Sequence, residues 1–111
     1  MKVKELASTL SLEILAGTAG IEKNISGGFC SDLLSYVMGK AQEGYIWITI
    51  QGHKNIMAVA SLKELSAIII ADDIMPEQGT LDLANEEEIP VLKSQLSSFE
   101  LAVELGKILK M

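Results

Sequence analysis

The polar residues that could bind or transform a ligand lie in four short segments, and residues 51–55 are the most informative of them. There a glycine, the only histidine, a lysine and an asparagine precede a helical pattern. Free backbone N–H groups at the start of a helix favour anions, so this segment predicts a binding site for a phosphate or carboxylate group. A purely structural interpretation stays open, in which Gly52 makes the turn, Asn55 caps the helix, and the two residues between them point into water.

The three other segments, residues 17–20, 71–73 and 93–94, follow apolar runs. A carboxylate at Asp72 could bind Mg²⁺ or accept a hydrogen bond from a ribose. Neighbouring residues of an extended chain point to opposite sides, so a turn is the favoured role for Asp72 and Asp73. Residues 17–20 lack the full dinucleotide fingerprint, and the chain has no phosphate-loop motif. The four segments together supply the candidate ligand-binding residues, which are Gly17, Thr18, Gln51, Gly52, His53, Lys54, Asn55, Asp72 and Ser94.

Nucleophilic and metal chemistry have less support. Cys30 lies in an apolar context, which favours a buried, inert thiol over a reactive thiolate. One cysteine and one histidine supply too few soft ligands for a transition metal, so we expect no metal and no cofactor. The acidic run 86–88 favours a solvated helix end. A small hydrolase or transferase, with His53 as the base and Asp72 as its partner, stays open as an alternative.

Charge and composition restrict the partners. The chain has 111 residues, with fifteen acidic residues against nine basic ones and a net charge of −6. All nine basic residues are lysines, and this charge repels phosphate backbones, so we expect no nucleic-acid binding. The longest uncharged stretch, residues 44–53, is far shorter than the roughly 20 residues of a membrane span. A lone cysteine fits a reducing compartment, so we expect a cytoplasmic protein with a single domain over residues 1–111.

Hydrophobic patterning predicts the elements that position the candidate residues. The apolar runs 45–50, 67–71 and 89–93 predict three strands that are buried on both faces. Helical patterns cover residues 55–65 and 80–88, and a last helix begins at Ser97, which forms a capping box with Glu100. The less regular first part predicts a helix at 3–10, strands at 12–16 and near Ile25, and a helix at 31–40.

This order of elements predicts how the candidate residues come together. Strands joined through helices run parallel with right-handed crossovers. We therefore expect an α/β fold, a three-layer α/β/α sandwich around a mainly parallel sheet of about five strands. Ligands in such sheets bind beyond the carboxyl ends of the strands, so all four segments are expected to line one crevice.

Several sequence motifs together carry a family resemblance. They are LAG at residues 15–17, ISGGF at 25–29, YIWITIQGHKNIMAVAS at 45–61, AIIIA at 67–71 and EIPVLKSQLSSFELA at 88–102. The chain resembles the DRTGG domain family, which is similar in fold to the N-terminal domain of HPr kinase/phosphorylase. The Asp-Arg pair that gives the family its name aligns near His53 and Lys54, and the Thr-Gly-Gly aligns near residues 71–73, so this chain retains neither.

The resemblance implies a direction for the function. Related domains occur in the regulatory regions of CBS-domain pyrophosphatases and beside phosphotransacetylase domains, where they resemble regulatory or dimerising modules. The resulting hypothesis is a non-catalytic module that senses a small anionic ligand such as a nucleotide, forms a homodimer, and acts on a partner enzyme or signalling protein. A protein-interaction adaptor without a ligand is the other alternative beside the small hydrolase or transferase.

Overall fold

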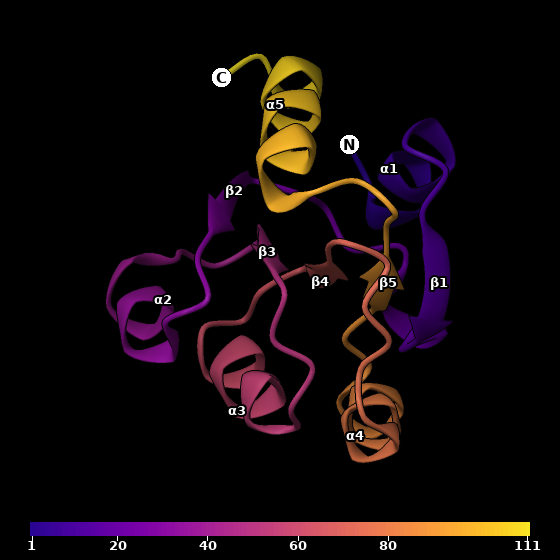
Figure 1. Cartoon of the computed structure of the whole chain (residues 1–111), viewed down its shortest axis with the longest axis vertical. Helices are drawn as coiled ribbons and strands as arrows, with labels where there is room; N and C mark the ends of the chain where they lie inside the picture. Colours follow the sequence, from indigo (N-terminus) through magenta and orange to yellow (C-terminus); the bar gives the residue numbers. More distant parts are fainter.

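The computed structural model describes the whole chain, residues 1–111, as five α-helices, one short 3-10 helix and five strands (Figure 1). In chain order the elements are α1 (Val3–Thr9), β1 (Glu13–Ala16), η1 (Thr18–Gly20), β2 (Gly27–Cys30), α2 (Leu34–Lys40), β3 (Tyr45–Thr49), α3 (Asn55–Leu62), β4 (Ala67–Ile70), α4 (Gln78–Glu87), β5 (Val91–Lys93) and α5 (Ser98–Leu109). None of these helices combines the length and the apolar character that crossing a membrane requires.

The strands form one mixed sheet in the order β1-β5-β4-β3-β2. Strands β2, β3, β4 and β5 are parallel, and β1 pairs antiparallel with β5. Helices α2, α3 and α4 cover one face of the sheet, while α1 and α5 cover the other (Figure 1). The predicted three-layer α/β sandwich with a mainly parallel five-stranded sheet is therefore confirmed.

The core consists of two apolar clusters, one on each face of the sheet. Alternate residues of the central strands divide between them: Trp47 and Ile68 face the α2–α4 layer, whereas Ile46 and Ile69 face α1 and α5. All four side chains are fully buried. The indole N–H of Trp47 donates to the Ser31 carbonyl at 2.8 Å, so this large side chain is buried with its polar atom satisfied.

The structure changes the bounds of several predicted elements: α3 ends at Leu62 and not at residue 65, α4 begins at Gln78, and β5 begins at Val91. The strand expected near Ile25 lies at Gly27–Cys30, and Asn24 forms only an isolated bridge with Lys2. Helix α2 begins at Leu34, three residues later than expected. Asn55 is the first residue of α3 and makes no cap, because Lys54 takes the N-cap position. The capping box of Ser97 and Glu100 at the start of α5 is confirmed, with Ser97 Oγ accepting from the Glu100 N–H at 3.1 Å.

Gly17 is required by the chain path between β1 and η1. Its φ is +73°, and a Cβ atom there would lie 2.1 Å from the Ile89 carbonyl oxygen. We expect Gly17→Ala to lower the free energy of unfolding by about 3 kcal/mol, because it adds left-handed backbone strain to a clash with fixed backbone. Denaturant unfolding followed by circular dichroism measures the change.

Gly39→Ala is the matched control for this prediction. Gly39 lies within α2, and an added Cβ would meet no atom within 4 Å. The same substitution there should stabilise the chain by about 0.5–1 kcal/mol, because alanine favours the helix over glycine. Equal effects at the two glycines would contradict the structural role assigned to Gly17.

Candidate ligand-binding site

Three of the four predicted segments gather at one edge of the sheet. Because β3, β4 and β5 are parallel, the loops that follow them lie at the same carboxyl edge. Hydrogen bonds join these loops directly: the Asp73 N–H donates to the Ser94 carbonyl at 2.7 Å, and the Glu77 N–H donates to the Gly52 carbonyl at 3.0 Å. Residues 51–55, Asp72 and Ser94 therefore share one end of the molecule.

Gly17 and Thr18 lie at the opposite edge, so the expectation that they join this crevice is wrong. Strand β1 runs antiparallel to β5, and its last residue, Ala16, pairs with Val91 at the start of β5. The Gly17 N–H donates to the Asn85 side chain at 2.7 Å. Strands β1 and β2 are linked by a loop that contains only the short 3-10 helix η1, so the rule for strands linked through helices does not fix the direction of β1, which lies at the edge of the sheet beside β5.

The loop between β3 and α3 presents free donors. The backbone N–H groups of Gly52, His53 and Lys54 donate to no acceptor in the chain, and the next one, Asn55 N–H, donates to His53 Nδ1 at 3.1 Å. The side chains of His53 and Lys54 are exposed. Three successive N–H donors before a helix, together with a lysine, form a positive cradle that suits an anion.

Asp32 is a residue of this edge that sequence reasoning missed. Its Oδ1 accepts from the Thr49 hydroxyl at 2.7 Å and from the Ile50 N–H at 2.9 Å. The Gln51 amide also donates to the Asp32 carbonyl at 3.3 Å. Asp32 thus holds the end of β3 and the start of the loop between β3 and α3. The sequence signal for it is an aspartate two residues after a strand, and a strand expected near Ile25 does not reveal it.

Asp72 and Asp73 form a turn, as the sequence predicted. Both have positive φ, at 58° and 56°, and the Ile74 N–H donates back to the Ala71 carbonyl at 3.3 Å. The Asp73 carboxylate pairs with the Lys93 ammonium. The side chain of Asp72 is therefore exposed and forms no salt bridge, whereas the carboxylate of Asp73 is paired with Lys93.

A cavity of about 410 Å³ lies beside this turn, and Ser94 lines it. Lys93 also lines it, pairing with Asp73 and lying 3.6 Å from the Glu13 carboxylate. The hydrogen bond with Asp73 raises the pKa of Lys93, so the lysine is charged but already neutralised by its partners. Ser94 is buried, and its Oγ accepts from the Leu96 N–H at 3.1 Å. This cavity therefore offers an anion fewer free hydrogen-bond donors than residues 52–54 do.

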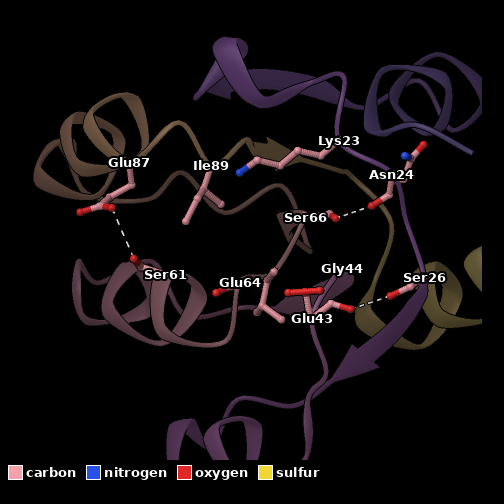
Figure 2. Close-up of a pocket in the computed structure, with 11 residues that line it drawn as sticks. Lys23, Asn24, Ser26, Glu43, Gly44, Ser61, Glu64, Ser66, Glu87 and Ile89 are labelled. Carbon is pink, nitrogen blue, oxygen red and sulfur yellow. Dashed lines mark hydrogen bonds between the residues drawn. The ribbon is translucent and has the colours of Figure 1, made fainter.

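The largest cavity, about 550 Å³, lies at the amino edge and contains none of the predicted residues (Figure 2). Glu43, Glu64 and Glu87 line it beside Lys23, whose ammonium donates to the Glu88 carbonyl at 2.9 Å. A hydrogen bond to the Glu64 carboxyl, followed by the charge of that group, raises the pKa of Glu43. This excess of acidic groups disfavours an anionic ligand.

The groups considered for catalysis do not form a constellation. Cys30 is exposed, so the expectation of a buried thiol is wrong, although partial burial of the sulfur and then the Asp32 charge raise its pKa. No three His, Cys, Asp or Glu side chains lie close enough to hold a metal ion together. His53 Nδ1 accepts the Asn55 N–H. That nitrogen therefore carries no proton to donate to the Asp72 carboxylate, as the hydrogen bond that orients a catalytic histidine requires.

Comparisons with known proteins agree with this architecture. The family model of the DRTGG domain matches residues 5–108, and the chain therefore belongs to the DRTGG domain family. A search of curated proteins finds no match. Among solved structures, the chain is similar to the CBS and DRTGG domains of the regulatory region of Clostridium perfringens pyrophosphatase, in complex with the activator diadenosine tetraphosphate. The identity is 20% and the TM-score 0.69, over 94% of this chain and 45% of that one, so the two share a fold.

Replacing Asp32 should loosen the loop between β3 and α3. We expect Asp32→Ala to lower the free energy of unfolding by about 2 kcal/mol, because the fully buried Thr49 hydroxyl loses its charged acceptor. Chemical denaturation measures this. Combining Asp32→Ala with Thr49→Val should give less than the sum of the single effects, since both remove the hydrogen bond that Thr49 and Asp32 share. Fully additive effects would contradict the assignment.

The Glu43 and Glu64 pair should make stability depend on pH. The folded chain holds the Glu43 proton more tightly than the unfolded chain does. The contact therefore contributes to stability at pH values below the usual glutamate pKa of 4.5, and this contribution is lost as the pH rises through the raised pKa of Glu43. Glu64→Gln removes the like charge, so its melting temperature relative to wild type should increase from acid to neutral pH.

Thermal unfolding followed by circular dichroism across that pH range tests the prediction. Glu86→Gln, an exposed carboxylate next to the cavity-lining Glu87, is the matched control and should show a difference from wild type that varies little with pH. A pH-independent difference for Glu64→Gln as well would rule out the interaction.

Proposed function

We propose that this chain is a non-catalytic regulatory module that binds a small anionic ligand of the nucleotide class and associates with itself. The observation that carries the proposal is the loop between β3 and α3, where three successive N–H groups without acceptors precede α3. The phosphate groups of the ligand accept from Gly52, His53 and Lys54, as anions do at other helix starts.

The charge distribution supports this position for the ligand. The net charge of −6 means that few places attract an anion. Lys2, Lys4 and Lys93 are paired with carboxylates, whereas Lys54 forms no salt bridge. Its ammonium is therefore free to pair with a phosphate at the loop.

The rest of the ligand meets polar groups at the same edge. Asp72 offers an exposed carboxylate that suits a ribose hydroxyl, and Gln51 and Asn55 flank the phosphate position. Ser94 acts by holding the neighbouring loop, since it is buried and bonded to the Leu96 N–H. Gly17 and Thr18 take no part.

The comparisons support the regulatory role. The solved relative is part of the regulatory region of an enzyme and was determined with diadenosine tetraphosphate, a polyanionic nucleotide described as its activator. By this likeness, we assign the present module a partner enzyme or signalling protein. The second copy of the chain is a separate part of the proposal. The single cysteine, unpaired in the fold, fits a place in the reducing cytoplasm.

Calorimetric titration with AMP, ATP, diadenosine tetraphosphate and inorganic phosphate tests the ligand site. Binding of at least one nucleotide is expected, and at a concentration of 100 times Kd it should stabilise the fold by about 2.7 kcal/mol in a thermal shift assay. Lys54→Gln should weaken that binding about tenfold, because one charge-assisted hydrogen bond is lost.

Lys63→Gln is the matched control, since it makes the same charge change at the other end of α3. It should bind the nucleotide as wild type does. Absence of binding by every compound would favour an adaptor without a ligand, and equal weakening by the two substitutions would place the ligand elsewhere.

A further inference from the structure

Helix α5 carries a second apolar stripe on the side away from the sheet. Leu101 and Leu105 are buried against the sheet, as expected for one face of an amphipathic helix. Phe99 and Val103 are 78% and 40% exposed, and Phe99 is the most exposed large hydrophobic residue of the chain. With the small residues Ala102 and Gly106, they follow the spacing of three and four residues that places side chains on one helix face.

An apolar groove of about 210 Å³ runs beside this stripe. Strand β2 forms one wall with Gly28, Phe29 and Cys30, and α5 forms the other with Ala102 and Gly106. Strand β2 is the last strand of the sheet, so no further strand covers the groove from outside (Figure 1). A Cβ atom built on Gly106 would meet nothing within 4 Å, which makes this position an open hollow in the helix surface.

We propose that a second copy of this chain docks on this surface, with the two α5 helices packed antiparallel about a two-fold axis. Phe99 and Gly106 are seven residues apart, or about 10 Å along the helix. A two-fold axis midway between them places the exposed ring of each copy in the groove beside Gly106 of the other copy. The same surface thus supplies both the projecting ring and the hollow that receives it, as an isologous interface requires.

The charges beside the stripe favour a second copy over an unrelated protein. Glu100 and Lys107 are also seven residues apart and lie on the same flank of α5. The antiparallel arrangement therefore sets Glu100 of each copy near Lys107 of the other copy. Within one chain, Lys107 has only the exposed Glu104 carboxylate at 3.7 Å as a partner.

This inference rests on the self-association in the proposed function and adds the surface that performs it. The surface is separate from the proposed ligand site at residues 52–54, because α5 and α3 lie on opposite faces of the sheet (Figure 1). Nucleotide binding and self-association can therefore fail independently, and titration of Phe99→Ser with the nucleotide bound by wild type tells the two apart.

Sedimentation velocity over a range of micromolar concentrations tests the proposal. Wild type should form a dimer, and Phe99→Ser should weaken its dissociation constant at least about 100-fold, because two buried rings are lost per dimer. Gly106→Leu, which fills the hollow, should have a similar effect while leaving the melting temperature of the dilute monomer close to that of wild type. Leu62→Ser, at a 72% exposed leucine of α3, is the matched control and should dimerise as wild type does.

Cys30 provides an independent probe because it is the only cysteine and lines the groove. Labelling it with a bulky maleimide should abolish the dimer. A wild-type chain that stays monomeric at high micromolar concentration would overturn the proposal, as would a dimer that neither Phe99→Ser nor Gly106→Leu weakens. Nucleotide binding that persists in such a monomer would leave the ligand site standing while removing the association surface.

Discussion

The structure depends on the burial of β3 and β4 between two layers of helices. Ile46–Thr49 of β3 and all of β4 are removed from water on both faces of the sheet. Such strands are stable only when helices cover each side, and connections that pass over a face return the chain parallel. Parallel strands in turn bring their trailing loops to one edge, so the position of residues 51–54 follows from the apolar character of the central strands.

The same constraint explains which parts of the fold could be predicted from the sequence. Runs such as residues 45–50 and 67–71 are strongly apolar and β-prone, so a local pattern locates them. Strand β2 begins with Gly27 and Gly28, which carry no such signal, and its place depends on pairing with β3. The direction of β1 is set by its pairing with β5, a contact between residues 75 to 80 positions apart that no local pattern shows.

The candidate site was predictable where it follows from strand order and hidden where it depends on side-chain geometry. The general rule for α/β sheets located residues 51–55, but it could not show that His53, and not Asn55, meets the first N–H of α3. At residues 71–73, Asp72 and Asp73 both take the left-handed conformation that glycine adopts most easily, which no local pattern of these two residue types indicates.

Asp32 connects the two surfaces to which we assign functions. Its hydrogen bonds hold Thr49, Ile50 and Gln51, which lead into the proposed ligand site at residues 52–54. Asp32 also lies two residues beyond Cys30, which lines the groove beside α5. A ligand changes self-association only if its affinity differs between the single and the paired chain, and the effect is then reciprocal. Because Asp32 joins the segment after β2 to residues 49–51, any coupling between the two proposed sites would pass through these hydrogen bonds.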